Sequence, residues 1–196
     1  MTQVSQTDLI VAAKAGRVVS FPTDTVPALA VKPEQSQLIF TVKQRSATKP
    51  LILMGATFRD LLPYIQGSPE EIKLWQKIAK KYFPGALTLV LPASNAVPKG
   101  MNPTNPKTIG IRVPDCKITQ EILAQTAPLA TTSANLSGQP PLETMTAIES
   151  AFGQVLTLNW EKSDLVVGSG LPSTVAKWTG QDWQILRQGT VVLSSP

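Results

Sequence analysis

Val18-Val-Ser-Phe-Pro-Thr-Asp-Thr25 decides how the rest of the chain can fold, because a strand-forming run passes here directly into a polar turn. The run before the proline predicts a short buried strand, which the proline ends. The turn beyond it presents the hydroxyls of Thr23 and Thr25 beside the carboxylate of Asp24. Strand ends in α/β sheets are the usual places for ligands, so the turn predicts a binding site, with an ordinary Asx or Ser/Thr turn as the alternative.

Similar apolar runs, bounded by proline and glycine, recur along the chain and predict further strands. They are Leu51–Met54, Leu87–Leu91, Ile109–Val113, Leu129–Thr132, Leu165–Val167, Thr174–Trp178 and Trp183–Leu186. These strands cluster more densely after residue 160, which indicates an antiparallel edge at that end of the sheet.

Segments with helical spacing and capping residues separate the strands. The predicted helices are Asp8–Ala15, Pro33–Val42, Ser68–Tyr82, Ile118–Gln125 and Thr144–Phe152. The third opens with Ser68-Pro-Glu-Glu71, a capping serine followed by a proline that suits a first turn. This alternation predicts an α/β fold built on one twisted, mixed sheet.

The stretch Ala93–Lys107 contains Pro98, Pro103 and Pro106 and is too rich in proline for regular structure. It predicts a mobile loop. A loop of that length is often functional, and a plain surface excursion is the alternative.

The chain has 196 residues, of which 42% are hydrophobic, enough for one packed core. We predict a single domain over residues 1–196. No apolar run approaches the roughly 20 residues that a membrane span needs, and the N-terminus lacks the basic and apolar regions of a secretory signal. We therefore expect a cytoplasmic protein with no membrane association.

Cys116 is the only cysteine and histidine is absent, which narrows the possible chemistry. A disulfide within the chain, a cysteine-rich zinc site, a Ser-His-Asp triad and a histidine-bound metal are all excluded. Lys and Arg outnumber Asp and Glu by 18 to 13. The net charge of +5 favours anionic partners, and phosphate ligands and RNA both remain open.

Lys43, Arg45 and Lys49 gather three cations within seven residues, between a predicted helix and the next strand. Arginine can grip a polyphosphate bidentately and lysine acts as a point charge, so the cluster suits a phosphate ligand. Basic residues in a last helical turn also complement the helix dipole, and that reading stays open.

Thr131-Thr-Ser-Ala-Asn-Leu-Ser-Gly138 packs hydroxyls, an amide and a glycine into one turn that could present donors to an anion. Neither a P-loop nor a Gly-x-Gly-x-x-Gly pattern occurs in the chain. Arg112 and Arg187 lie on predicted strands among apolar residues, and a buried arginine needs an anionic partner or a ligand. Pairing of such an arginine with an acid of the chain is the structural alternative, and the candidates are Asp24, Asp115 and Glu143.

Together these motifs resemble the YrdC-like family, which is similar to this sequence over nearly its whole length. The family's features are a Pro-Thr-Asp/Glu-Thr turn, a Lys-x-Arg pair, a Ser-x-Asn turn, a Ser-Thr-Val strand and a late Leu-Arg-x-Gly. In the same order the chain has Pro22–Thr25, Lys43 with Arg45, Ser133 with Asn135, Ser173–Val175 and Leu186–Gly189. The resemblance implies a YrdC-like twisted mixed sheet flanked by helices, with a positively charged concave face.

The resemblance also implies an activity, that of an L-threonylcarbamoyladenylate synthase. Such an enzyme joins L-threonine, bicarbonate and ATP into threonylcarbamoyl-AMP and pyrophosphate, for threonylcarbamoyladenosine modification of tRNA. Mg²⁺ would accompany ATP, downstream threonylcarbamoyl transferase proteins would use the product, and the basic face would bind RNA or tRNA. The alternative is a non-catalytic, double-stranded RNA-binding or ribosome-associated protein of the same family.

Roles in the family are implied for matching positions of this chain. The residues implied to hold L-threonine are Thr25, Arg112, Thr131 and Ser173. Those implied to face ATP are Arg45, Lys49, Thr108, Ser133, Pro141 and Arg187. Lys43, with Arg45, would support the phosphates during catalysis, and Asn135 would shape its turn.

The chain departs from the family at Val26-Pro-Ala-Leu-Ala30, where Val-Tyr-Gly-Leu-Gly is usual. Proline fixes its φ angle and removes a donor, and alanine cannot take glycine-only angles cheaply. We therefore predict that L-threonine is bound, but more weakly than when Tyr and Gly replace Pro27 and Ala28.

Overall fold

The computed structural model describes residues 2–44, 46, 48–160 and 168–193. Its helices are α1 (Gln6–Lys14), α2 (Gln37–Val42), α3 (Phe58–Leu61), α4 (Pro69–Tyr82), α5 (Lys117–Thr126) and α6 (Met145–Ala151). Short 3₁₀ turns cover Pro33–Gln35, Leu62–Tyr64 and Lys99–Met101. Among these helices none has the length and apolar character that a membrane crossing requires.

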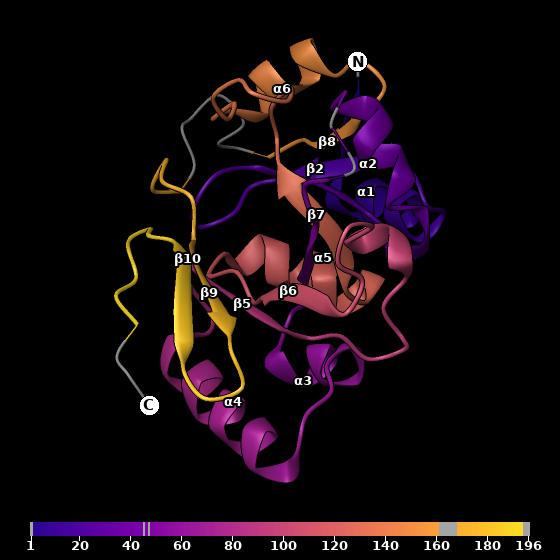
Figure 1. The fold of residues 1–196 in the computed structure, drawn as a ribbon. Helices are drawn as coiled ribbons and strands as arrows, with labels where there is room; N and C mark the ends of the chain where they lie inside the picture. The colour runs from indigo at the N-terminus through magenta and orange to yellow at the C-terminus, as the bar shows by residue number, and fades with distance from the viewer. Residues whose placement is uncertain (1, 45, 47, 161–167, 194–196) are drawn as a thin grey trace.

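The strands are β1 (Gln3–Val4), β2 (Val19–Phe21), β3 (Ala28–Val31), β4 (Ile52–Met54), β5 (Leu87–Pro92), β6 (Thr108–Arg112), β7 (Leu129–Ser133), β8 (Leu156–Leu158), β9 (Thr174–Trp178) and β10 (Trp183–Arg187). Within the described residues they form one sheet in the order β1-β8-β2-β3-β7-β4-β6-β5-β9-β10 (Figure 1). The sheet contains both parallel pairs, such as β4 with β6, and antiparallel pairs, such as β3 with β7. The predicted mixed α/β sheet is therefore confirmed, and so is the antiparallel edge, where β10 pairs with β9.

The expectations that failed concern short elements. The predicted helix Pro33–Val42 is a 3₁₀ turn followed by α2, with Ser36 between them. The strands β1, β3 and β8 were not predicted, because runs of two to four residues become strands only through the neighbours that pair with them. The predicted strand Leu165–Val167 lies outside the described residues.

Helices cover the sheet and close two apolar cores. Helices α1 and α5 pack on each other and bury Leu9 and Ile122 against Phe21 of β2. The larger core includes Ile39 of α2 and Trp75 of α4. Burial of apolar side chains of this size contributes about 1.5–3 kcal/mol each, so these two cores stabilise the packing of the helices on the sheet.

Helix α4 secures the β9–β10 end of the sheet (Figure 1). Its start is a capping box in which the Ser68 hydroxyl accepts from the Glu71 amide and the Glu71 carboxylate accepts from the Ser68 amide. The second oxygen of Glu71 accepts a hydrogen bond of 2.8 Å from the indole of Trp178 on β9. Trp178 also meets the ring of Trp75 edge-on, with centroids 6.3 Å apart. One carboxylate thus both caps α4 and ties it to the outer strands.

The proline-rich stretch Ala93–Lys107 contains the 3₁₀ turn Lys99–Met101 and is hydrogen-bonded at several points, and its predicted mobility stays a prediction. The Ala93 amide donates to the Lys107 carbonyl at 2.9 Å, and the Leu51 amide donates to the Met101 carbonyl at 2.8 Å. The Met101 side chain is fully buried. The segment therefore packs beside β4 and β6.

Candidate functional site

A cavity of about 650 Å³ lies against one face of the sheet. Because side chains alternate along a strand, its floor is made of every second residue of several strands. These include Ala28, Ile52, Met54, Thr88, Val90, Gly110, Val175 and Leu186. A cavity of this size lies in the range of small-molecule and cofactor sites.

Arg112 lies at the bottom of the cavity with only 3% of its surface exposed. Its guanidinium donates to Asp24 at 2.6 Å, to the Thr25 hydroxyl at 2.8 Å and to the Gly85 carbonyl at 3.2 Å. Asp24, one of the three acids that the sequence offered as partners of a buried arginine, is therefore the residue that pairs with Arg112. The geometry nevertheless leaves the guanidinium in the cavity wall, where it can also meet an anion.

Burial lowers the pKa of Arg112, and the charge of Asp24 opposes this, while Arg187 lowers the pKa further. An arginine keeps its proton at any pH at which proteins remain folded. The buried positive charge is therefore permanent, and Asp24 compensates part of its desolvation cost. A ligand carboxylate or phosphate would compensate more of it.

The Pro-Thr-Asp-Thr turn after β2 is held by hydrogen bonds within the turn and by contacts with the segment that begins at Gly168. The Thr23 hydroxyl lies 3.0 Å from that of Thr25 and donates to the Val26 carbonyl. Gly168 crosses so close to the turn that a Cβ on it would lie 2.4 Å from the Thr25 carbonyl oxygen, and its φ is +83°. Only glycine fits there without strain. The next amides, of Ser169 and Gly170, donate to the carbonyls of the turn.

Ser173 and Arg187 contact each other in the lining of the cavity, at the same end as Arg112. The Arg187 guanidinium donates to the Ser173 carbonyl at 3.0 and 2.8 Å and to its hydroxyl at 3.2 Å. The Ser173 hydroxyl also lies 2.9 Å from that of Thr88. A Cβ on Gly189 would lie 2.4 Å from the Pro172 carbonyl oxygen, which explains why glycine ends the Leu-Arg-x-Gly motif.

The Ser-x-Asn turn after β7 is built around Lys43. This lysine is fully buried, and its ammonium donates to the Ser133 carbonyl and, at 2.9 Å, to the Asn135 side-chain oxygen. The same oxygen accepts from the Ser133 hydroxyl at 2.6 Å, while the Asn135 amide donates to the carbonyls of Leu136 and Gln139. Lys43 therefore lies behind the turn and orders Ser133 at the cavity.

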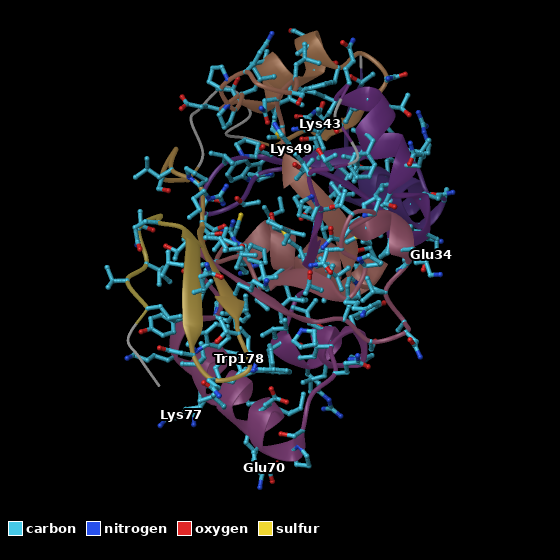
Figure 2. The ribbon with its side chains drawn as sticks, in the orientation of Figure 1. Glu34, Lys43, Lys49, Glu70, Lys77 and Trp178 are labelled. Atoms are coloured by element: carbon cyan, nitrogen blue, oxygen red, sulfur yellow. The ribbon has the colours of Figure 1, made fainter. Side chains whose placement is uncertain are left out.

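The opposite end of the cavity is formed by Lys49, Thr108 and the 93–107 segment. The Thr108 hydroxyl accepts a hydrogen bond of 3.1 Å from Asn102, which also donates to the Thr108 carbonyl. Figure 2 shows Lys43 and Lys49 in the same part of the molecule, away from Lys77 and Glu70 on α4.

The structure brings most of the predicted residues together. Those that line the cavity are Thr25, Lys49, Thr108, Arg112, Thr131, Ser133, Pro141, Ser173 and Arg187. Thr131 is fully buried, and its hydroxyl donates to the Ile52 carbonyl at 3.0 Å. Lys43 and Asn135 lie behind the wall, and Arg45 lies outside the described residues.

Several cavity residues were not singled out from the sequence. Thr88, Asn102, Gly110 and Lys177 all line it. Thr88 and Lys177 alternate with apolar neighbours on their strands, which indicates that each lies on a defined face of the sheet. The sequence does not show which face of the sheet carries a cavity. Asn102 sits in a loop, where polar residues are ordinary.

The fold and the cavity define a class of protein, α/β domains in which a large twisted mixed sheet flanked by helices carries a cavity on one face, with a buried arginine in the cavity wall. Residues 11–189 match the model of the Sua5/YciO/YrdC family, which is described as telomere recombination. The chain belongs to this family.

Named relatives agree with this assignment. The chain is 34% identical over 184 residues to a threonylcarbamoyl-AMP synthase of Vibrio campbellii, which covers 91% of this chain and 95% of the relative. It is 39% identical over 131 residues to a threonylcarbamoyl-AMP synthase of Bos taurus, which covers 64% of this chain and 45% of the relative.

Solved structures share the fold. The Sua5 protein of P. abyssi in complex with L-threonine superposes with a TM-score of 0.79 at 30% identity and covers 95% of this chain. This chain spans 55% of the length of that Sua5 chain. The YciO protein of E. coli superposes with a TM-score of 0.76 at 24% identity over 94% of this chain and 89% of its own, which shows the fold.

Proposed function

We propose that the chain is a threonylcarbamoyl-AMP synthase, which makes threonylcarbamoyl-AMP, pyrophosphate and water from L-threonine, bicarbonate and ATP. The names of its relatives and the L-threonine bound to the P. abyssi Sua5 protein support this. The observation on which the proposal depends most is the single cavity that joins a buried Arg112 end to a Lys49 and Thr108 end. An amino acid and a nucleotide could lie there side by side.

In the proposed reaction the amine of L-threonine forms an N–C bond to carbon dioxide derived from bicarbonate and loses a proton, which gives a carbamate. A carbamate oxygen then attacks the α-phosphorus of ATP. The bond from this phosphorus to the bridging oxygen breaks, and pyrophosphate leaves with the electron pair. Such a transfer depends on positioning and on charge stabilisation more than on a strong base.

Each end of the cavity has a proposed task. Arg112 would bind the threonine carboxylate, and the hydroxyls of Thr25 and Ser173 would orient its polar groups, with Thr131 beside them. Asp24 would keep the Arg112 guanidinium in one plane, because their hydrogen bond is only 2.6 Å long. A preorganised guanidinium loses little entropy when the substrate binds.

At the other end, Lys49, Thr108, Ser133 and Pro141 would face the nucleotide, with Arg187 between the two substrates. Lys43 would act through the Ser-x-Asn turn, since its ammonium contacts Ser133 and Asn135. We propose Arg45 as a phosphate contact from its place in the Lys-x-Arg motif alone.

Mg²⁺ would enter with ATP. No carboxylate lines the cavity among the described residues, and those residues hold no acidic cluster suited to a metal. Mg²⁺ readily keeps water and phosphate oxygens as its ligands, so the cavity suits an ion that ATP itself carries. When bound it would neutralise phosphate charge, and we assign it no protein ligand.

The test is to supply purified protein with ATP, L-threonine and bicarbonate and to measure AMP-linked product and pyrophosphate. We expect both products only when all three substrates are present, and neither when L-threonine is replaced by L-serine at equal concentration. Release of pyrophosphate without L-threonine, or no product with all three substrates, would argue against the synthase.

The non-catalytic RNA-binding alternative is not favoured, because the relatives are named as synthases. We propose RNA binding only as a secondary, salt-dependent property of the net charge of +5. A cytoplasmic location and delivery of the product to threonylcarbamoyl transferase proteins complete the proposal.

A further inference from the structure

Lys177 contributes a further positive charge to the lining of the cavity. It lies on β9, its side chain is half-buried, and it lines the cavity together with Val90 and Val175. Within the described part of the chain, the side chain of Lys177 makes no hydrogen bond or ion pair. The ion pair among these residues joins Arg112 and Asp24. A lysine that is partly desolvated without a partner favours an anion as its ligand.

The sheet register places Lys177 among the floor residues of the cavity. Lys177 lies opposite Val90, Val90 opposite Gly110, and Gly110 opposite Ile52. Gly110 has no side chain, which leaves space in the cavity above the middle of this row. Lys177 lies at the end of the row on β9. Along β6, Gly110 lies two residues from Thr108 and two residues from Arg112, so the row that ends in Lys177 crosses the middle of the cavity.

Along β9, Lys177 lies on the side away from Ser173, and its row is the next one after that of Arg112 toward Thr108. Ser173 lies next to β9 at the Arg112 end, and four residues of extended chain place Lys177 roughly 13 Å further along. In a displacement at phosphorus the leaving group departs on the side opposite to the attacking oxygen. With threonine held beside Arg112 and Ser173, the leaving pyrophosphate would point toward Lys177.

We propose that Lys177 binds the phosphoryl groups of the nucleotide beyond the α-phosphate and so holds the departing pyrophosphate. The inference rests on the proposed function for the identity of the anion. The surroundings agree with an anion, because no carboxylate lines the cavity among the described residues, and Asn102, Thr104 and Asn105 contribute neutral polar groups to its lining.

The test compares binding of inorganic pyrophosphate, ATP and AMP by calorimetry in the wild type, Lys177→Met and Lys177→Arg. For Lys177→Met we expect the Kd for pyrophosphate and ATP to rise about tenfold or more, as for loss of a charge-assisted hydrogen bond. The Kd for AMP should change less than twofold. Lys177→Arg keeps the charge and should retain most of the affinity.

Lys77→Met is the matched control, because it removes the same charge from the exposed face of α4 (Figure 2). Pyrophosphate affinity within twofold of the wild type in Lys177→Met, or an equal loss in Lys77→Met, would overturn the proposal. An equal loss for AMP would also overturn it, since Lys177 would then contact the nucleoside monophosphate. If Lys177→Met loses pyrophosphate while the wild type makes no threonine-dependent product, the anion site stands and the synthase assignment fails.

Discussion

At the scale of single residues, Arg112 combines an ion pair within the chain with a place in the cavity wall. From the sequence, an acid of the chain and a ligand were alternative partners for this arginine. In the structure Asp24 takes one nitrogen of the guanidinium and Thr25 another, and the group still lines the cavity. Asp24 therefore orients the guanidinium without lining the cavity, which the proposed binding of a carboxylate by Arg112 requires.

Ala28 is the residue at which the departure from the family pattern can be tested. It lies on β3 opposite Phe21 and Ser133 and contributes to the cavity wall. In Pro27→Tyr, Ala28→Gly we expect L-threonine to bind about fivefold more tightly, equivalent to about 1 kcal/mol, because the wall gains room and backbone freedom. Calorimetric titration with L-threonine measures this, with L-serine as the comparison ligand.

Ala28→Gly alone removes the methyl group from the wall while Pro27 stays in place. Ala30→Gly is its control, since Ala30 is on the same strand and does not line the cavity. Both variants should lose about 0.5–1 kcal/mol of unfolding free energy, as glycine does in a strand. Unchanged threonine affinity in both Ala28 variants would mean that this segment does not limit binding.

At the scale of elements, Glu71 links α4 to β9 and makes that link sensitive to pH. Hydrogen bonds from the Ser68 amide, and next from the Trp178 indole, lower the pKa of Glu71 below its ordinary value of 4.5. A carboxyl group whose pKa is lowered by folding stabilises the folded state above its unfolded pKa. This contribution is lost as the pH falls from about 4.5 through the folded pKa.

Gln keeps an oxygen that can accept the capping hydrogen bonds, so for Glu71→Gln we expect only the loss of the charge. The free energy of unfolding should fall by about 0.3–0.5 kcal/mol at pH 7, as for a solvent-screened charge at a helix N-terminus. The difference from wild type should shrink as the pH drops below about 4.5. Urea unfolding at a series of pH values measures it, and Glu70→Gln serves as the control in the same helical turn. A difference that is constant from pH 7 to pH 3 would contradict the role of the charge.

At the scale of the whole molecule, the cavity draws on strands from β3 to β10, so a ligand in it contacts the sheet across much of its width. A ligand that binds only the folded state stabilises it by about 2.7 kcal/mol at 100 times its Kd. For a chain of this size we expect ATP at that concentration to raise Tm by about 5–10 °C. Thermal unfolding with and without ATP measures the shift.

Sodium chloride at the same ionic strength is the control for that shift. We expect it to leave Tm within about 1 °C, because screening acts weakly on exposed charges. An equal rise with salt would show that the effect of ATP is not due to binding in the cavity. Addition of L-threonine to the ATP sample should raise Tm further if both molecules occupy the cavity together.

The sequence by itself determined the fold class, the strands of five or more residues, the antiparallel edge and the family. These follow from local signals, such as the alternation of Thr174–Trp178 and the capping serine before α4, which depend only on neighbours along the chain. The order of motifs then indicated which residues to group, including Thr25 and Arg112.

Only the tertiary structure decided which of these residues face one cavity and which stand behind it. Lys43 and Lys49 are equivalent as sequence, yet one is buried beneath Ser133 and the other lines the cavity. Strands as short as β3 and β8 form only because they pair with segments far apart in the chain. The same kind of pairing places Lys177 in the cavity. The physical reason is that burial and register arise from contacts between distant segments, whereas sequence patterns record only the neighbours of each residue.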